Sequence, residues 1–460
     1  MEAPVRFRSA RIARHRQLIT GTGVLAIGAA IQGITGTLFW LIASQLDEKV
    51  DVGSATKLFT SVLFVTYLAG IGLPVALARY APGRDRDSDV VFTWSVATTV
   101  VSSTLLAGAY VAAFEFTDIF RSSATEVLTD FHGVGGPAIF MVAVIGAALS
   151  MIVDVRCMTA RRWNLVLARI AIVGVIRIPL LFALRGAEHR ALWLFVFAIG
   201  PVAASGIVGA MFAPALAMGR HRFGPMPAAT RAAVRYSLIS YVSTLAYQAP
   251  YFSLPIIVLT SVDGESYASF YLAWGMVGLA FYVPTAIGQA LLAEGGRDGV
   301  RVYSQVKLAM MLTMPLMVAG ALAAFLGKGL VTTVFGAKYG DAARVLPVMM
   351  AAGVPWAISS LLLSEARVLH RHLPTVAITM TLTLAILIPA LRLVPIDGID
   401  GASRAWFLGN LVAAGVAIVF TVAARRQAAA AERRAEPLDA EISAYLAGEH
   451  QPAPVPSRQA

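Results

Sequence analysis

Residues 334–346 read VFGAKYGDAARVL, a short polar, turn-forming stretch that separates two long apolar runs of the chain. Gly336 allows the backbone to reverse direction, and Tyr339 suits the headgroup layer of a membrane. The runs on either side, near 304–327 and 342–364, exceed the roughly 20 apolar residues that cross a bilayer as a helix. The stretch therefore predicts an interfacial turn between two membrane-spanning helices.

The composition extends this prediction to the whole chain. Of its 460 residues, 58% are hydrophobic and 14% are charged, and the mean hydropathy is +0.72. Ordinary soluble domains are far less apolar. We predict an all-α polytopic membrane protein with about twelve spanning helices of roughly 20 residues or more. They cover residues 18–46, 54–78, 90–114, 134–154, 165–184, 191–218, 234–261, 266–293, 304–327, 342–364, 373–391 and 402–424.

Positive charges fall mainly in alternate connections between these helices. Lys and Arg number 37 against 26 Asp and Glu, which gives a net charge of +11. The positive-inside rule then places both ends of the chain in the cytoplasm. The run at 18–46 follows a basic segment and is too long for a signal peptide, so we expect it to remain as the first helix. The charge excess is a topology signal and predicts no nucleic-acid partner.

An even number of helices in each half predicts a duplicated six-helix unit, because six crossings return the chain to its starting side. A weak internal repeat agrees: ARYAPGRD at 78–85 and LLAEGGRD at 291–298 each follow the second helix of a half. The predicted organisation is a basic cytoplasmic segment at 1–17, an N-terminal lobe at 18–218, a cytoplasmic linker at 219–233, a C-terminal lobe at 234–424 and a disordered cytoplasmic tail at 425–460.

The opening stretch also resembles a known signature. The pattern Phe335, Gly336, Tyr339, Ala343 and Leu346 before the tenth helix is similar to that of polysaccharide-transporter flippases, which belong to the multidrug, oligosaccharidyl-lipid and polysaccharide exporter superfamily. GIDGASRAWFLGNLVAAG (398–415) resembles the family's entry into a late helix, and GIGLPVALARYAP (70–82) resembles its second-helix exit. Two positions depart from the pattern: Val52-Gly53 stands where Tyr-Gly is frequent, and Arg404 lies among usually small residues.

The resemblance implies a fold and a function. Such proteins form two six-helix lobes in a V and open a central cavity to each side of the membrane in turn. They carry a polyprenyl-pyrophosphate-linked oligosaccharide across the bacterial cytoplasmic membrane during cell-surface polysaccharide biosynthesis. The expected partners are this lipid-linked substrate and the bilayer. A polysaccharide polymerase or glycosyltransferases are left open as further partners. The expected state is a monomer.

Moving a diphosphate through a bilayer requires cations that are shielded from lipid. Arg177 lies near the middle of the fifth helix, and Arg169 precedes it by a rotation of about 80°, so both could face one cavity. Lys57 is a third candidate. Structural alternatives are pairing with backbone carbonyls for the arginines, and snorkelling to the headgroups for Arg169 and for Lys57.

The seventh helix carries YSLISYVSTLAYQAPYFSLP at 236–255, whose polar residues recur at spacings of three and four. One face of this helix is therefore polar, and it predicts either contacts to sugar or hydrogen bonds to neighbouring helices. Pro250 and Pro255 remove backbone donors and predict a kink that could gate a cavity. Gln32 in the first helix is a weaker counterpart. The sugar-binding candidates of the seventh helix are Tyr241, Thr244, Tyr247, Gln248 and Tyr251.

Acidic residues are confined to helix ends. Asp154, Glu294 and Glu365 fall at predicted cytoplasmic ends, and no Asp or Glu lies near a midplane. The drug exporters of this superfamily typically keep a carboxylate within a helix, so this pattern argues against cation-coupled drug export. Asp154 is the candidate for ion coupling, and pairing with nearby Arg156 is its structural alternative.

The remaining motifs predict a transporter and no catalytic site. The sequence has no GxxxxGK[ST] loop and no Cys/His cluster with metal-ligand spacing, so we expect neither a cofactor nor a metal, and Cys157 is interpreted as structural. The favoured function is a lipid-linked oligosaccharide flippase working by alternating access. An exporter of small amphiphiles or drugs is the alternative. A membrane glycosyltransferase or polymerase is more distant, because the longest outer connection, 115–133, is too short for a catalytic domain.

Overall fold

The computed structural model describes residues 27–28, 31–70, 77, 86–116, 135–160, 162–183, 188–216, 218, 220–225, 228–295, 302–369 and 371–446. Those residues fold into α-helices with no β-strand. Eight helical stretches among them are long and apolar enough to cross a membrane. The Gly-Arg-Asp repeats at 83–85 and 296–298, and the connection at 117–134, lie outside this part of the chain.

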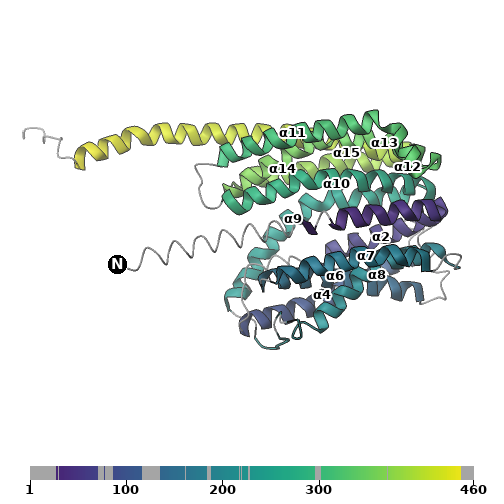
Figure 1. Ribbon diagram of the computed structural model, residues 1–460. Helices are drawn as coiled ribbons and strands as arrows, with labels where there is room; N and C mark the ends of the chain where they lie inside the picture. The colour runs from purple at the N-terminus through teal and green to yellow at the C-terminus, as the bar shows by residue number, and fades with distance from the viewer. Residues whose placement is uncertain are drawn as a thin grey trace, which may run out of the picture.

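The helices follow the predicted apolar segments, and the all-α class is confirmed (Figure 1). The first half of the chain contains a helical segment at 31–46, α2 (Lys49–Ala69), α4 (Arg86–Phe116), α6 (Gly135–Thr159), α7 (Trp163–Ala183) and α8 (Arg190–Met211). The second half contains α9 (Ala228–Ser261), α10 (Gly264–Gly295), α11 (Val302–Leu326), α12 (Lys328–Phe335), the 3-10 turn η3 (Ala337–Tyr339), α13 (Gly340–Ala351), α14 (Gly353–Val368) and α15 (His372–Leu446).

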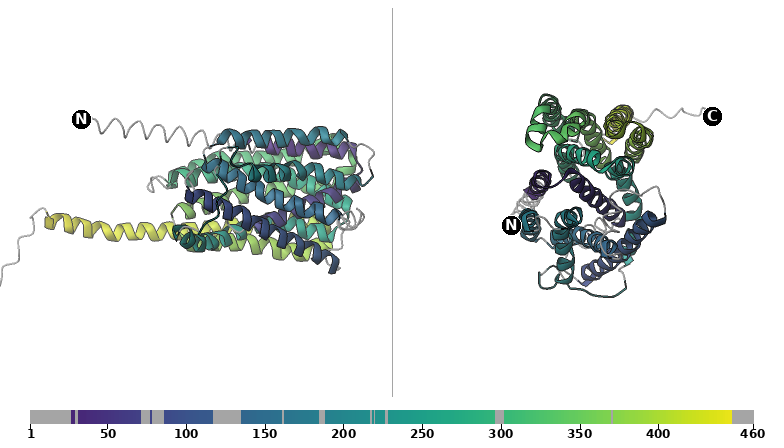
Figure 2. Two further views of the ribbon diagram at one scale, coloured as in Figure 1. Left: turned by 90° about the horizontal axis from the view of Figure 1, so that it is seen from below. Right: turned by 90° about the vertical axis from the view of Figure 1, so that its right-hand side faces the viewer.

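The two halves lie side by side with their helices roughly parallel (Figure 2). Within the first half, α6 and α8 approach closely: a Cβ added to Gly206 would lie 2.1 Å from the carbonyl oxygen of Gly146. Small residues allow such approach between apolar helices, where no hydrophobic force favours contact. The largest apolar core joins both halves, with Phe39 and Val62 from the first and Phe270 from the second.

The opening stretch contains the end of α12, η3 and the start of α13. Gly336 has φ +92°, which is the left-handed region that glycine occupies without strain. Tyr339 is only 1% exposed, so it lies inside the protein instead of facing the headgroup layer as its type predicts. Lys49 of α2 and Lys338 each place their ammonium group 5.7 Å from its ring centroid. The turn therefore packs as a core element and contacts the other half.

Two predicted boundaries differ from the structure. α15 continues to Leu446 and extends beyond the bundle (Figure 1), so residues 425–446 are helical where a disordered tail was predicted. The reason is that Ala, Arg and Glu, which dominate this segment, have high helix propensity. The linker, predicted at 219–233, ends before α9 begins at Ala228.

The linker residues 220–225 dock on the first turns of α4. The backbone N–H of Arg222 donates to Thr93 Oγ1 at 2.8 Å, and Trp94 Nε1 donates to the carbonyl of Gly224 at 3.0 Å. These contacts attach the start of the connection between the halves to the first half.

Gly398 divides α15 into the two predicted helices. Its φ of +57° and ψ of −132° are non-helical and suit glycine alone. We predict that Gly398→Ala lowers the free energy of unfolding by about 1–3 kcal/mol because alanine is strained there. Thermal unfolding in detergent measures the change. Gly415→Ala is the matched control in the same helix, since a Cβ there meets nothing within 4 Å. Equal melting temperatures for the two variants would contradict the assignment.

Candidate functional site

A cavity of about 430 Å³ lies between the two halves. Its wall combines the first helix, α2 and α7 of the first half with α9 and α10 of the second half. We call it the Arg177 cavity. The residues that line it are Gln32, Gly33, Gly36, Thr37, Trp40, Phe59, Leu63, Arg177, Tyr251, Tyr271, Leu272, Gly275, Met276, Gly278 and Leu279.

Among the described residues that line this cavity, Arg177 is the only charged one. Its side chain is buried, with 7% of the residue exposed, and its Nε donates to the carbonyl of Val173, one turn earlier in α7, at 3.2 Å. Within the described residues, no carboxylate pairs with it. A guanidinium inside an apolar bundle is costly unless a partner compensates its charge. The cavity therefore offers an unneutralised cation to an incoming anion.

Two other predicted residues join Arg177 at the cavity. Gln32 comes from the first helix and Tyr251 from α9. Their amide and hydroxyl groups can donate to and accept from the hydroxyls of a sugar. The structure thus brings three predicted residues from three helices into one space, although they are far apart in the sequence.

An aromatic group forms another part of the wall. The ring centroids of Trp40, Phe59 and Tyr271 lie 5.6–6.3 Å apart, and the rings meet edge to face. The edge-to-face arrangement is favourable for aromatic quadrupoles. Sequence reasoning did not identify these residues, because isolated aromatic residues in apolar helices carry no periodic signal.

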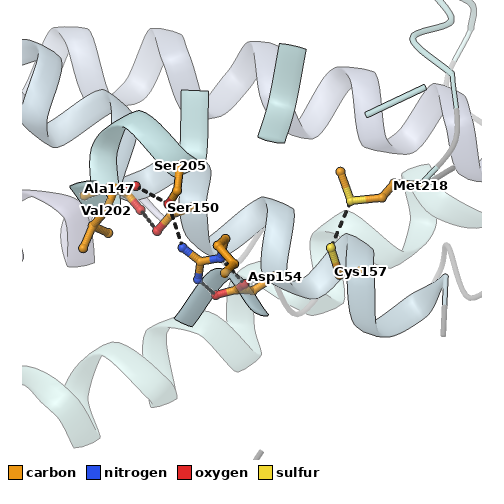
Figure 3. A network of polar contacts seen from close by, with 8 residues as sticks. Ala147, Ser150, Asp154, Cys157, Val202, Ser205 and Met218 are labelled. Atoms are coloured by element: carbon orange, nitrogen blue, oxygen red, sulfur yellow. Dashed lines mark hydrogen bonds and ion pairs between the residues drawn. The ribbon is translucent and has the colours of Figure 1, made fainter. Parts of the chain in front are cut away.

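Arg169 does not line the Arg177 cavity. Its Nε donates to Asp154 at 2.8 Å, its Nη2 also bonds that carboxylate, and its Nη1 donates to Ser205 Oγ at 3.0 Å (Figure 3). Eight residues separate Arg169 from Arg177, a rise of about 12 Å along the helix, so a shared face does not mean a shared depth. The expectation that both arginines face one cavity is wrong.

The same contacts correct the expected partner of Asp154. Residues two apart on a helix do not face each other, so Arg156 points away from Asp154. Arg156, which is fully buried, instead donates to Asp89 of α4 at 3.0 Å. Asp154 is paired with Arg169, and its role in ion coupling stays a prediction.

Lys57 lies between the halves and does not snorkel. Its residue is 1% exposed. Its ammonium donates to the carbonyl of Val262 at 2.9 Å and lies 5.8 Å from the ring centroid of Tyr267. Tyr267 in turn donates to Thr60 Oγ1 at 2.8 Å. Lys57 therefore joins α2 to the end of α9 and the start of α10.

Further polar contacts between the halves gather around α12, at what we call the α12 end of the bundle (Figure 1). Gln45 Nε2 donates to the carbonyl of Val334 at 2.8 Å, and Lys338 Nζ donates to the carbonyl of Asp47 at 3.2 Å. A Cβ on Gly53 would lie 1.9 Å from the carbonyl oxygen of Gly264, so α2 and α10 touch through their backbones. The two halves are therefore closed together at the α12 end.

The predicted polar face of α9 divides between two surroundings. Tyr247 faces α14, where its hydroxyl lies 3.4 Å from Ser360 Oγ and its ring stacks on Trp356. Gln248 is half-buried, whereas the side chains of Tyr241 and Thr244 lie outside the described residues. α9 is helical through Pro250 and Pro255, and gating by these prolines stays a prediction.

No protein-family model and no curated protein sequence matches the chain, whereas several solved structures resemble it. An inward-facing multidrug resistance MATE family transporter of the MOP superfamily has a TM-score of 0.62 at 17% identity, over 87% of this chain and 95% of that one. Lipid II flippase MurJ, in an inward closed conformation, has a TM-score of 0.65 at 11% identity, over 86% and 87%. An outward-facing MATE transporter has a TM-score of 0.54 at 14% identity, over 91% and 96%. These likenesses show that the chain has the fold of these transporters.

We predict strong energetic coupling between Asp154 and Arg169. Asp154→Asn or Arg169→Gln alone leaves the other charge unpaired, whereas the double variant removes both. The coupling free energy should reach about 1–3 kcal/mol in a double-mutant cycle measured by thermal stability in detergent. The exposed pair Asp397 and Arg404, 2.8 Å apart, is the matched control and should couple by less than about 1 kcal/mol. Equal coupling in the two cycles would refute the difference.

A second prediction concerns closure at the α12 end. Lys57→Met removes a charged hydrogen bond and a cation–π contact between the halves, so it should raise the ratio of open to closed molecules about tenfold. Distances between spin labels at Val50 and Leu330, both exposed, report this ratio. Lys328→Met is the control, because the ammonium of Lys328 lies over Phe325 of its own half. Unchanged label distances in Lys57→Met would show that Lys57 does not hold the halves together.

Proposed function

We propose that this chain is a membrane flippase for lipid-linked oligosaccharides, with the anionic headgroup bound at Arg177 between the two halves. The observation that carries the proposal is a buried guanidinium with no carboxylate partner among the described residues, lining a cavity that both halves share. The fold, which is also that of a lipid II flippase, supports it. The resemblance of residues 335–346 to polysaccharide-transporter flippases points in the same direction.

The chemistry of the cavity suits a sugar diphosphate. A guanidinium forms two parallel hydrogen bonds to phosphate oxygens, and its charge offsets part of the charge of the diphosphate. Gln32, Thr37 and Tyr251 supply amide and hydroxyl groups for sugar hydroxyls. The lipid tail needs no specific contact, because it can stay in the bilayer while the headgroup crosses.

The arrangement of the halves suits alternating access. On the positive-inside prediction, the α12 end faces the outside of the cell, and its contacts close that side. The higher TM-score to the inward-facing MATE structure, 0.62 against 0.54 for the outward-facing one, supports this interpretation. The state described is then one in which the outer side is shut and the headgroup enters from the cytoplasm.

Cation-coupled export of small amphiphiles or drugs is the competing proposal, since a multidrug resistance MATE transporter shares the fold. Coupling to a cation needs a carboxylate that binds it, yet the described lining residues of the Arg177 cavity include Arg177 and neither Asp nor Glu. Among the described residues, the charge of the site therefore favours an anionic substrate.

We predict that Arg177→Ala lowers flipping of a polyprenyl-diphosphate-linked sugar at least about tenfold, because the charged hydrogen bonds to phosphate are lost. Arg177→Lys should fall between, since it keeps the charge but not the paired geometry. Proteoliposomes with a labelled sugar headgroup measure the rate. Arg404→Ala, an exposed arginine at the α12 end, is the control and should flip normally.

The outcomes separate the two proposals. The flippase is supported if depletion of the protein makes the lipid-linked oligosaccharide accumulate on the cytoplasmic leaflet. Wild type should then reverse this accumulation, and Arg177→Ala should not. Wild-type proteoliposomes that export a small amphiphile under an ion gradient and leave the sugar lipid in place would establish the exporter instead.

A further inference from the structure

Two pairs of glycines line the Arg177 cavity from different halves of the protein. Gly33 and Gly36 belong to the first helix, and Gly275 and Gly278 belong to α10. A spacing of three places the members of each pair on one face of their helix. The wall of the cavity is therefore bare backbone at four positions.

An added Cβ would crowd a neighbouring side chain at only two of these glycines. A Cβ on Gly33 would lie 2.9 Å from Leu279 Cδ1, and one on Gly278 would lie 2.9 Å from the hydroxyl oxygen of Tyr251. At Gly36 and Gly275, a Cβ would meet nothing within 4 Å. Glycine inside a helix costs about 0.5–1 kcal/mol relative to alanine, and no close contact requires it at these two positions. The space in front of them is itself the feature to be explained.

A second observation connects this space with a ligand. Arg177, nine-tenths buried and without a carboxylate partner in the described part of the chain, lines the same cavity. Trp40 and Tyr271 line it as well. An occupant thus meets a cation, flat aromatic rings and an open slot within one space.

We propose that Gly36 and Gly275 keep open a specificity slot for the sugar ring that is joined directly to the diphosphate. The inference rests on the proposed function, since it assumes a diphosphate at Arg177. The ring next to the diphosphate must lie beside Arg177, and the C–H faces of a pyranose pack on aromatic rings such as Trp40 and Tyr271. Its hydroxyls meet the polar groups of Gln32 and Thr37, which a polyprenyl chain could not use.

Two different parts of the site then recognise the diphosphate and the sugar. Arg177 binds the diphosphate whatever it carries, whereas the slot distinguishes one attached ring from another or from none. Filling the slot should therefore weaken binding of a sugar-bearing lipid and leave a bare polyprenyl diphosphate unaffected.

The test uses the full chain in detergent and two probes, polyprenyl diphosphate and the same lipid carrying one N-acetylhexosamine. Gly36→Leu and Gly275→Leu should weaken binding of the sugar-bearing probe about tenfold or more and change binding of the bare probe less than about twofold. Gly36→Ala should give a smaller loss. Gly415→Leu is the matched control, because a Cβ at Gly415 also meets nothing within 4 Å and Gly415 does not line the cavity.

The outcomes distinguish failure of the slot from failure of the proposed flippase function. Unchanged binding of the sugar-bearing probe by both Leu variants would overturn the slot, and so would equal weakening of the two probes. Arg177→Ala should weaken both probes together. If wild type binds neither probe, the proposed function itself is overturned, and the slot with it.

Discussion

The cost of positive charge inside apolar helices governs the arrangement of this structure. A cation at the centre of a membrane-spanning helix costs roughly 2.5–3.5 kcal/mol on insertion scales, so it must find a partner. Arg156 finds Asp89, Arg169 finds Asp154, and Lys57 finds a carbonyl and an aromatic ring. Arg177 has a carbonyl of its own helix and faces the cavity. Among these four cations of the described residues, Arg177 therefore offers an anion the strongest electrostatic attraction, because it lines a cavity and has no carboxylate partner.

The contacts between the halves follow from the same cost. Lys57 is close enough to the start of α2, about 12 Å along the helix axis, for its long side chain to reach water if the halves separate. Its loss of the Val262 carbonyl would then be offset by hydration. A buried cation near a helix end can thus stabilise the closed state while keeping the free-energy cost of opening small. Opening would cost more at a deeply buried ion pair, whose charges would lose each other, or at a fully apolar contact, which would be exposed to water.

Hydropathy alone predicts nearly all of the fold, because each apolar segment must be a helix in the absence of water. The chain reversal at Gly336 was also readable from the sequence, since glycine alone occupies this backbone region without strain. Partners were not readable. Proximity in the sequence suggested that Asp154 pairs with Arg156. In the structure, Asp154 instead accepts a hydrogen bond from Arg169 of the next helix. The tail showed the opposite error, because its composition suggested disorder while its helix propensity extends α15.

The glycines show why the site was harder to predict than the fold. At Gly206 the missing side chain lets two helices touch, and at Gly36 it leaves a cavity open, yet the sequence shows the same letter for both roles. Only the neighbouring atoms distinguish them. The proposed function also implies a kinetic consequence. A single guanidinium at Arg177 would bind a diphosphate without neutralising it, so the headgroup would be attracted but not trapped. On the same proposal, the shape of the slot would select the sugar, and the modest charge attraction would still allow release on the far side of the membrane.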